Sequence, residues 1–246
     1  MILAATPYGD LPHTLPVRYL SRHAWTEGPG TVRSRIAAIV KSAPAWAYLV
    51  DSEDDRNRGD VGPVVEVLQA LAECSPLSER FVYDSQLRVT NPSQRDGALA
   101  RLAARTGNQT DQDLYAWSTA IVRDVYLMAE PISKATPYAI DHARTERGLE
   151  AYLQLNAEVM LQESKLFNAA VWPCVHERYH TGHGAGENIW IPRDRWAKYV
   201  AAVRARWPGN PIVWWSGAME ANPGVPGEGY PWPAERDLRR YAESLA

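Results

Sequence analysis

The sequence predicts an α/β protein of the (β/α) TIM-type barrel class, and three observations lead to this prediction. Short apolar runs alternate with amphipathic segments of helical period, which is the pattern of βα units and a mainly parallel sheet. The runs are apolar at nearly every position, as expected for strands that are buried on both faces. No glycine-rich nucleotide fingerprint follows the first run, and 246 residues is an ordinary length for one barrel. We therefore expect a single domain over residues 1–246.

Six runs have the character of strands. Each is short, rich in apolar residues and bounded by polar or turn residues. They cover 2–5, 45–50, 81–83, 124–129, 168–175 and 211–215. A seventh and an eighth run can be placed around 17–20 and within 106–121. The predicted barrel is therefore irregular, or has fewer than eight regular βα units.

Helical patterns separate these runs. Thr31 is an N-cap candidate for the first helix, and Pro63 stands in the first turn of the second. Residues 92–122 form two helical pieces, because Thr-Gly-Asn at 106–108 interrupts the pattern. The remaining helices are expected over 141–165, from Pro192 through Val203, and around Leu238–Leu245.

The composition argues against several functional classes. The net charge is −3 and no block of like charge is present, so nucleic acid is not an expected partner. No apolar run is long enough for a membrane span, and the segment MILAATPYGD lacks the features of a signal peptide. We expect a soluble phage or bacterial protein that is cytoplasmic or virion-associated. Ten Trp and twelve Tyr against two Phe favour contacts with sugars, because these rings combine an apolar face with a hydrogen-bonding edge.

Acidic residues follow four of the predicted strands, at Asp51, Asp84, Glu130 and Glu177. The carboxyl ends of parallel barrel strands meet at one rim, so these carboxylates are expected to converge there. Two carboxylates across a sugar are the basic equipment of glycoside hydrolysis. We predict Glu130 and Glu177 as the catalytic pair, one acid and one nucleophile or base, with Asp51, Glu53 and Asp84 as reserves. Each of them has a structural alternative, because acids after strands also cap helices or pair with arginine.

Aromatic and imidazole side chains near the same strand ends are candidates for binding the sugar. Flat rings stack on the apolar face of a sugar, and the edges of indole, phenol and imidazole groups form hydrogen bonds. The predicted substrate-binding residues are Trp172, Tyr179, Trp214, Trp215, His176 and His180.

Residues 176–180 form a literal H-E-x-x-H, the zinc-protease signature when it lies on a helix. A zinc site of this kind needs the two histidines one helical turn apart on a stable helix. Pro173 precedes the motif and several glycines follow it, so such a helix would be short. We therefore predict a strand end that enters a loop, with no metal and no cofactor. A zinc metallohydrolase that uses His176, Glu177 and His180 is the alternative.

The segment from NAAVWPCVHERYH to IPRDRWAKYVAAVRARWPGNPIVWWSG resembles the final βαβ unit of barrel glycosidases of the hyaluronidase-like kind. The shared features are a strand that ends in an aromatic-rich Tyr-His loop, an I-P-x-x-x-W helix start, and a strand that ends in tryptophans and Ser-Gly. The resemblance implies a glycosidase acting on a polysaccharide or glycan. Those enzymes carry a paired D-x-E motif after a strand, and its nearest match, Asp51-Ser52-Glu53, comes earlier in this chain than the family suggests.

A non-catalytic role is the third interpretation. A barrel of this kind can serve as a structural or glycan-binding part of a larger assembly, such as a virion or a cell-surface complex. Binding of glycans without turnover would distinguish this role from hydrolysis.

Overall fold

The computed structural model describes the chain except for residues 7, 58, 85–86, 88, 126, 128–130, 134–135, 179–189 and 217–234. The chain divides into two compact units. Unit 1 comprises Met1–Pro16, Val125–Ala157 and Pro173–Ala246, and unit 2 comprises Val17–Asp124 and Glu158–Trp172. The single domain expected over 1–246 stays a prediction.

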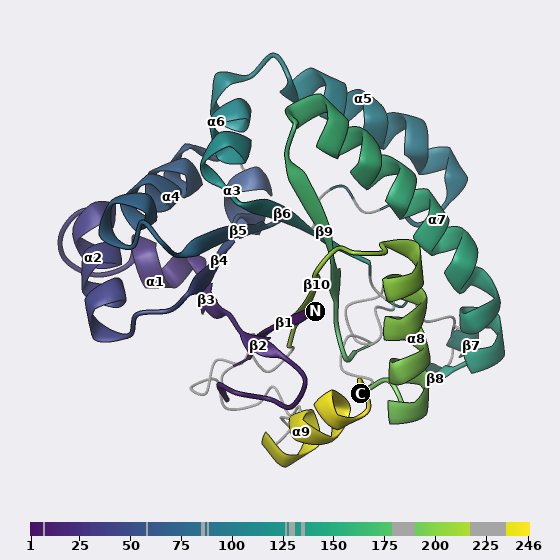
Figure 1. Cartoon of the computed structure of the whole chain (residues 1–246). Helices are drawn as coiled ribbons and strands as arrows, with labels where there is room; N and C mark the ends of the chain where they lie inside the picture. The colour runs from purple at the N-terminus through teal and green to yellow at the C-terminus, as the bar shows by residue number, and fades with distance from the viewer. Residues whose placement is uncertain are drawn as a thin grey trace. The chain divides into compact units, whose positions relative to one another are not determined.

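Unit 2 is an alternation of parallel strands and helices (Figure 1). Strands β3 (Arg18–Leu20), β4 (Ala47–Asp51), β5 (Glu79–Tyr83) and β6 (Ala120–Asp124) pair with one another in this order, and every pairing is parallel. The helices between them are α1 (Arg22–Thr26), α2 (Val32–Ser42), α3 (Glu53–Asn57), α4 (Gly62–Cys74), the 3-10 turn η1 (Pro92–Gln94), α5 (Arg95–Arg105) and α6 (Gln109–Trp117).

The helices of unit 2 begin at the predicted signals. The Thr31 side chain accepts a hydrogen bond from Ser34 N (3.2 Å) and caps α2, and Pro63 lies in the first turn of α4. Asn108 separates α5 from α6 and caps α6 by accepting from Asp111 N (3.2 Å). Helix α4 lies between α2 and α6 and contacts both (Figure 1). Its buried side chains are Val64, Val65, Val67, Leu68, Ala70 and Leu71.

Unit 1 has a parallel set of strands in the order β2-β1-β10-β9. All four residues of β1 are buried, as the uninterrupted apolar runs predict. A separate antiparallel pair consists of β7 and β8. The bounds are β1 (Ile2–Ala5), β2 (Leu15–Pro16), β7 (Pro131–Ser133), β8 (Thr136–Ile140), β9 (Ala170–Val175), β10 (Ile212–Trp215), α7 (His142–Phe167), α8 (Arg193–Arg206) and α9 (Glu235–Glu243). The division between the units falls within α7 and within β9.

The strand order of the whole chain is β2-β1-β10-β9-β6-β5-β4-β3. Eight parallel strands with helices between them confirm the predicted fold class, an α/β fold of the TIM-barrel type. The order begins and ends with β2 and β3, which are neighbours in the chain and are separated only by Val17. The predicted irregularity lies here, because these two strands have only two and three residues and no helix connects them.

The strand predicted over 124–129 is wrong in position. Strand β6 covers Ala120–Asp124 and all five of its residues are buried. The charged pair Arg123-Asp124 was expected at or outside the strand boundary, but both residues belong to the strand. Arg123 is buried because it forms ion pairs with Asp84 and Glu163. The acid at the end of this strand is therefore Asp124 and not Glu130.

Helix α7 is the longest helix described, with 26 residues. Neither α7 nor any other helix in the described part of the chain combines the length and apolarity needed to cross a bilayer.

Candidate functional site

The H-E-x-x-H motif follows β9 directly. Strand β9 ends at Val175, and residues 176–178 continue without forming a helix. Arg178 pairs with Trp190 in an antiparallel bridge, and Ile191 N donates to the backbone oxygen of Glu177 (3.0 Å). The predicted strand end is thus confirmed for the first three residues of the motif, and the helix that a zinc protease needs is not formed there. Tyr179 and His180 lie outside the described residues.

The Glu177 side chain is fully buried, and both of its carboxylate oxygens accept hydrogen bonds. Trp214 Nε1 donates to Oε2 (2.8 Å) and Ser216 Oγ donates to Oε1 (2.9 Å). These donors come from the carboxyl end of β10 and the residue after it, and β10 pairs with β9. Ser216 is itself fixed, because its backbone N–H donates to Ala5 O (3.0 Å). Glu177 therefore has a defined orientation, which a binding or catalytic carboxylate requires.

His176 is buried beside Cys174 and Trp215. Its Nε2 lies 3.7 Å from Cys174 Sγ, and its ring centroid lies 5.1 Å from that of Trp215. Thiolate sulfur and imidazole nitrogen are both zinc ligands, so these two side chains could supply two donors to a metal ion. Cys174 is a free, buried cysteine.

Two of the three tryptophans predicted to stack on sugar are buried, and the third, Trp172, is half-buried. Trp214 and Trp215 are 0% and 3% exposed, and Trp214 packs on Trp196 with ring centroids 5.5 Å apart. Trp172 lies in the middle of β9, where its ring is 5.0 Å from that of Phe81 in unit 2. The indole N–H of Trp214 is used to hold Glu177. The sequence therefore did not indicate that Trp214 and Trp215 are buried, and a role of these residues in binding stays a prediction.

In unit 2, the Asp51 side chain caps the start of α3, which begins at Glu53. Asp51 ends β4, and its Oδ1 accepts from Glu53 N (3.0 Å) at the first residue of α3. Asp51 Oδ2 accepts from Tyr19 OH (2.8 Å). The Glu53 residue is exposed. These two contacts join Asp51 to the start of α3 and to β3, and a role of Asp51 in binding stays a prediction.

Asp84 follows β5 and lies within a buried group of charged residues that we call the Asp84 cluster. Arg123 Nη1 is 2.7 Å from Asp84 Oδ1, Arg56 Nε is 3.1 Å from Oδ2, and Arg105 Nη1 is 3.6 Å from Oδ2. Asp84 is 0% exposed. The cluster consists of Asp84, Asp111, Glu163, Arg56, Arg105, Arg123 and Tyr115, with Arg56 bound to Asp111 and Arg123 bound to Glu163. Its three positive and three negative formal charges cancel.

Burial and charge act in opposite directions inside the Asp84 cluster. Burial by itself would lower the pKa of Arg123, but Asp84 and Glu163 raise it well above its ordinary value. The pKa of Arg105 is lowered, because burial outweighs the attraction of Asp84. Burial raises the pKa of Tyr115, and Glu163, which accepts its hydroxyl hydrogen (2.6 Å), adds to the rise. The charges of the cluster thus compensate one another, and a catalytic role of Asp84 stays a prediction.

Asp124 is a strand-end acid that the sequence did not identify as a candidate. It is 2% exposed, and its Oδ2 accepts from Tyr83 OH (2.8 Å). An acidic residue at the end of an apolar run is visible in the sequence here, but the predicted strand over 124–129 begins at Asp124, whereas β6 ends there. Glu130 lies outside the described residues, so its part in the catalytic pair stays a prediction.

No family model matches the chain, and no curated protein matches it. Solved structures with some similarity were found. Bee venom hyaluronidase is 11% identical, with a TM-score of 0.41, over 83% of this chain and 63% of that chain. A Cellulomonas fimi endo-β-1,4-mannanase double mutant is 14% identical, with a TM-score of 0.40, over 92% and 62%. A putative sugar phosphate isomerase/epimerase from Anabaena variabilis is 9% identical, with a TM-score of 0.42, over 93% and 95%.

The chain spans less than two thirds of the hyaluronidase and of the mannanase. A hyaluronidase is thus among the solved structures with some similarity to this chain. Similarity at these identities concerns the fold and does not transfer an activity, because one barrel fold hosts many chemistries. The function has to be argued from the side chains of this chain.

Proposed function

We propose that this chain is a carbohydrate-active hydrolase that cleaves a polysaccharide or glycan, with Glu177 as one of its two carboxylates. The observation that carries the proposal is the buried Glu177 carboxylate, held at both oxygens beyond the carboxyl end of β9. Barrel enzymes assemble their active sites from residues at this end of their strands. Trp214 and Ser216 supply the support that keeps such a carboxylate in one orientation.

The proposed chemistry divides the two carboxylate roles of glycoside hydrolysis between Glu177 and Glu130. Both Glu177 oxygens accept hydrogen bonds, as the oxygens of an ionised carboxylate do, which suits a nucleophile or base. Glu130 would protonate the glycosidic oxygen as the bond to the anomeric carbon breaks. Glu177 would either attack that carbon, with water later releasing the sugar, or take a proton from the attacking water.

The zinc alternative has weaker support. It requires His176 and His180 one turn apart on a helix, whereas the described part of the motif, residues 176–178, is not helical. A non-catalytic glycan-binding role remains as an outcome of the activity test below.

The test compares hydrolysis by the wild type, Glu177→Gln and Glu130→Gln on a panel of polysaccharides, measured as the release of reducing ends. We expect each substitution to lower the rate by roughly 10²- to 10⁴-fold, because each removes an acid, a base or a nucleophile. The amide that Glu177→Gln introduces fits the same space, since the Ser216 hydroxyl can change from donor to acceptor.

Glu73→Gln is the matched control, because Glu73 is an exposed carboxylate on α4 and should leave the rate unchanged. Full activity in both Glu177→Gln and Glu130→Gln would overturn the proposed pair. Glycan binding by the wild type without any turnover would favour the non-catalytic role instead.

A further inference from the structure

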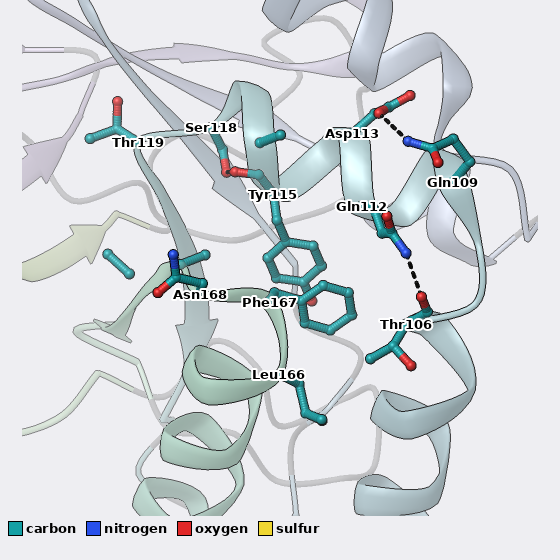
Figure 2. A pocket seen from close by; sticks show the side chains of 13 residues that line it. Thr106, Gln109, Gln112, Asp113, Tyr115, Ser118, Thr119, Leu166, Phe167 and Asn168 are labelled. Carbon is teal, nitrogen blue, oxygen red and sulfur yellow. Dashed lines mark hydrogen bonds between the residues drawn. The ribbon is translucent and has the colours of Figure 1, made fainter.

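A pocket of about 750 Å³ lies in unit 2, and it contains none of the residues considered so far as catalytic candidates (Figure 2). It is lined by the residue after α5, by one side of α6, by the two residues before β6, and by the chain from the end of α7 to the first residue of β9. The pocket therefore adjoins the amino end of β6, and Asp124 stands at the other end of that strand. Its size falls within the range of small-ligand sites, roughly 300–1,000 Å³.

An aromatic pair forms the apolar part of this pocket. The rings of Tyr115 and Phe167 are stacked, with centroids 3.7 Å apart and planes 7° apart. Tyr115 is buried and Phe167 is half-buried, so Tyr115 covers one face of Phe167 and part of the Phe167 ring remains accessible. A partly open ring among polar groups suits the apolar C–H face of a sugar.

Amide side chains stand on both sides of this ring pair (Figure 2). Gln112 Nε2 donates to Thr106 O (2.5 Å), and Gln109 Nε2 donates to Asp113 Oδ1 (2.8 Å). These bonds fix the planes of the two glutamine amides and leave their oxygens able to accept from a ligand. On the other side, the Asn168 amide is exposed and makes no hydrogen bond to the other pocket residues drawn in Figure 2. The pocket thus presents acceptors on two fixed glutamine amides, and a donor on the Asn168 amide.

The backbone holds Asn168 at the edge of the pocket. It directly follows α7 and has a φ of 48°, the left-handed conformation that ends many helices. The next residue is tied to the helix, because Ala169 N donates to Ser164 O (3.2 Å) and Ser164 Oγ donates to Ala169 O (2.7 Å). Glycine adopts this conformation at a lower energetic cost than asparagine. The cap alone therefore does not require the amide side chain that the sequence has here.

The charge of the lining restricts the ligand class. Among the residues that line the pocket, Asp113 is the one carboxylic acid and there is no lysine or arginine. A phosphate or carboxylate ligand would meet a negative charge without a cation to balance it. Hydroxyl groups can donate to Asp113 and to the amide oxygens, and can accept from the Asn168 amide. We infer that this pocket binds one or two residues of a neutral saccharide, as a binding site independent of the proposed hydrolysis by Glu177.

The test follows the side-chain amide signals of Gln109, Gln112 and Asn168 by nitrogen-15 NMR while a neutral hexasaccharide is added. Cellohexaose, mannohexaose and xylohexaose are the probes, and Glu177→Gln protein is used so that no turnover consumes them. We expect saturable shifts of the pocket amides with at least one probe. In an added Asn168→Gly substitution the Gln112 signal should report a Kd about fivefold weaker, the effect of losing one hydrogen bond.

His13→Gly is the matched control, because His13 is the other non-glycine residue described with a positive φ and lies outside the pocket. It should bind as tightly as the parent, and Asn168→Gly should keep the same fold because glycine accepts the left-handed backbone. Absence of any shift at millimolar probe, or equal affinity in the Asn168→Gly protein, overturns the inference. Hydrolysis by the wild type without pocket shifts would refute the binding site alone, and pocket shifts without hydrolysis would refute the proposed function alone.

Discussion

Two fully buried carboxylates stand just beyond strands in the two units, and their surroundings differ. Glu177 in unit 1 accepts hydrogen bonds from an indole N–H and a hydroxyl. Asp84 in unit 2 lies within ion-pair distance of three arginines. Both carboxylates are 0% exposed, so burial does not distinguish the proposed catalytic Glu177 from Asp84. The described donors differ, because three arginines surround Asp84 whereas Trp214 and Ser216, the two donors described above for Glu177, are neutral.

The largest effect on stability is expected when the Asp84 carboxylate is neutralised, compared with neutralising the Glu177 carboxylate in a second variant. Asp84→Asn should lower the free energy of unfolding by about 3–5 kcal/mol, because it leaves buried arginines without their central counterion. Glu177→Gln should cost only about 1 kcal/mol, because its neutral donors keep hydrogen-bond partners. Urea denaturation of both variants measures the difference. Equal losses in the two variants would contradict the contrast between the two carboxylates.

A smaller effect is expected from the edge of the Asp84 cluster at high pH. Burial and Glu163 raise the pKa of Tyr115 above its ordinary value of 10.0. Above pH 10 the unfolded chain therefore loses this proton before the folded chain does, and the contribution of Tyr115 to stability falls as pH rises. Tyr115→Phe should cost about 1–2 kcal/mol at neutral pH through the lost hydrogen bond to Glu163.

The loss of stability caused by Tyr115→Phe should become smaller between about pH 10 and pH 11. In this range the wild type loses the stabilising contribution of the Tyr115 hydroxyl, whereas the variant has no hydroxyl proton to lose. Urea denaturation of the wild type and the variant from neutral pH to about pH 11 tests this. A constant difference over the whole range would show that the cluster does not hold Tyr115 in its neutral form.

The smallest effect is expected for an exposed ion pair in the same unit. Arg33 Nη1 lies 2.7 Å from Glu73 Oε2, between α2 and α4, and the two side chains are 54% and 52% exposed. Arg33→Gln should cost less than about 1 kcal/mol, because water screens exposed pairs. Thermal unfolding at low and high salt gives the measurement. A loss as large as that of Asp84→Asn would mean that ion pairing, and not its burial, stabilises unit 2.

Much of the fold could be predicted because buried parallel strands appear in the sequence as continuous runs of apolar residues. The predicted runs 2–5, 168–175 and 211–215 overlap closely with β1, β9 and β10. The error at β6 has a physical cause. Arg123 interrupts an apolar run, and nothing near it in the sequence reveals that Asp84 and Glu163, about 40 residues away on either side, compensate its charge.

The candidate site could be predicted only in part. The position of Glu177 after a strand was visible from the order of residues. The role of Trp214 was not, because an indole can stack on a ligand or donate from the interior, and the choice depends on contacts across the sheet. The arginines around Asp84 come from 56, 105 and 123, so only the folded chain brings them to one carboxylate.

The bridge between Arg178 and Trp190 and the hydrogen bond from Ile191 N to Glu177 O hold the backbone of Glu177 independently of its side chain. Ile191 binds the backbone oxygen of Glu177, whereas Trp214 in β10 and the following Ser216 bind its carboxylate. The path of the chain at Glu177 and the orientation of its carboxylate are therefore fixed by different contacts, so a substitution of Trp214 or Ser216 can release the carboxylate without breaking the backbone bridge. Residues of β10 and the position after it thus control the direction of the carboxylate, although they lie far from Glu177 in the sequence.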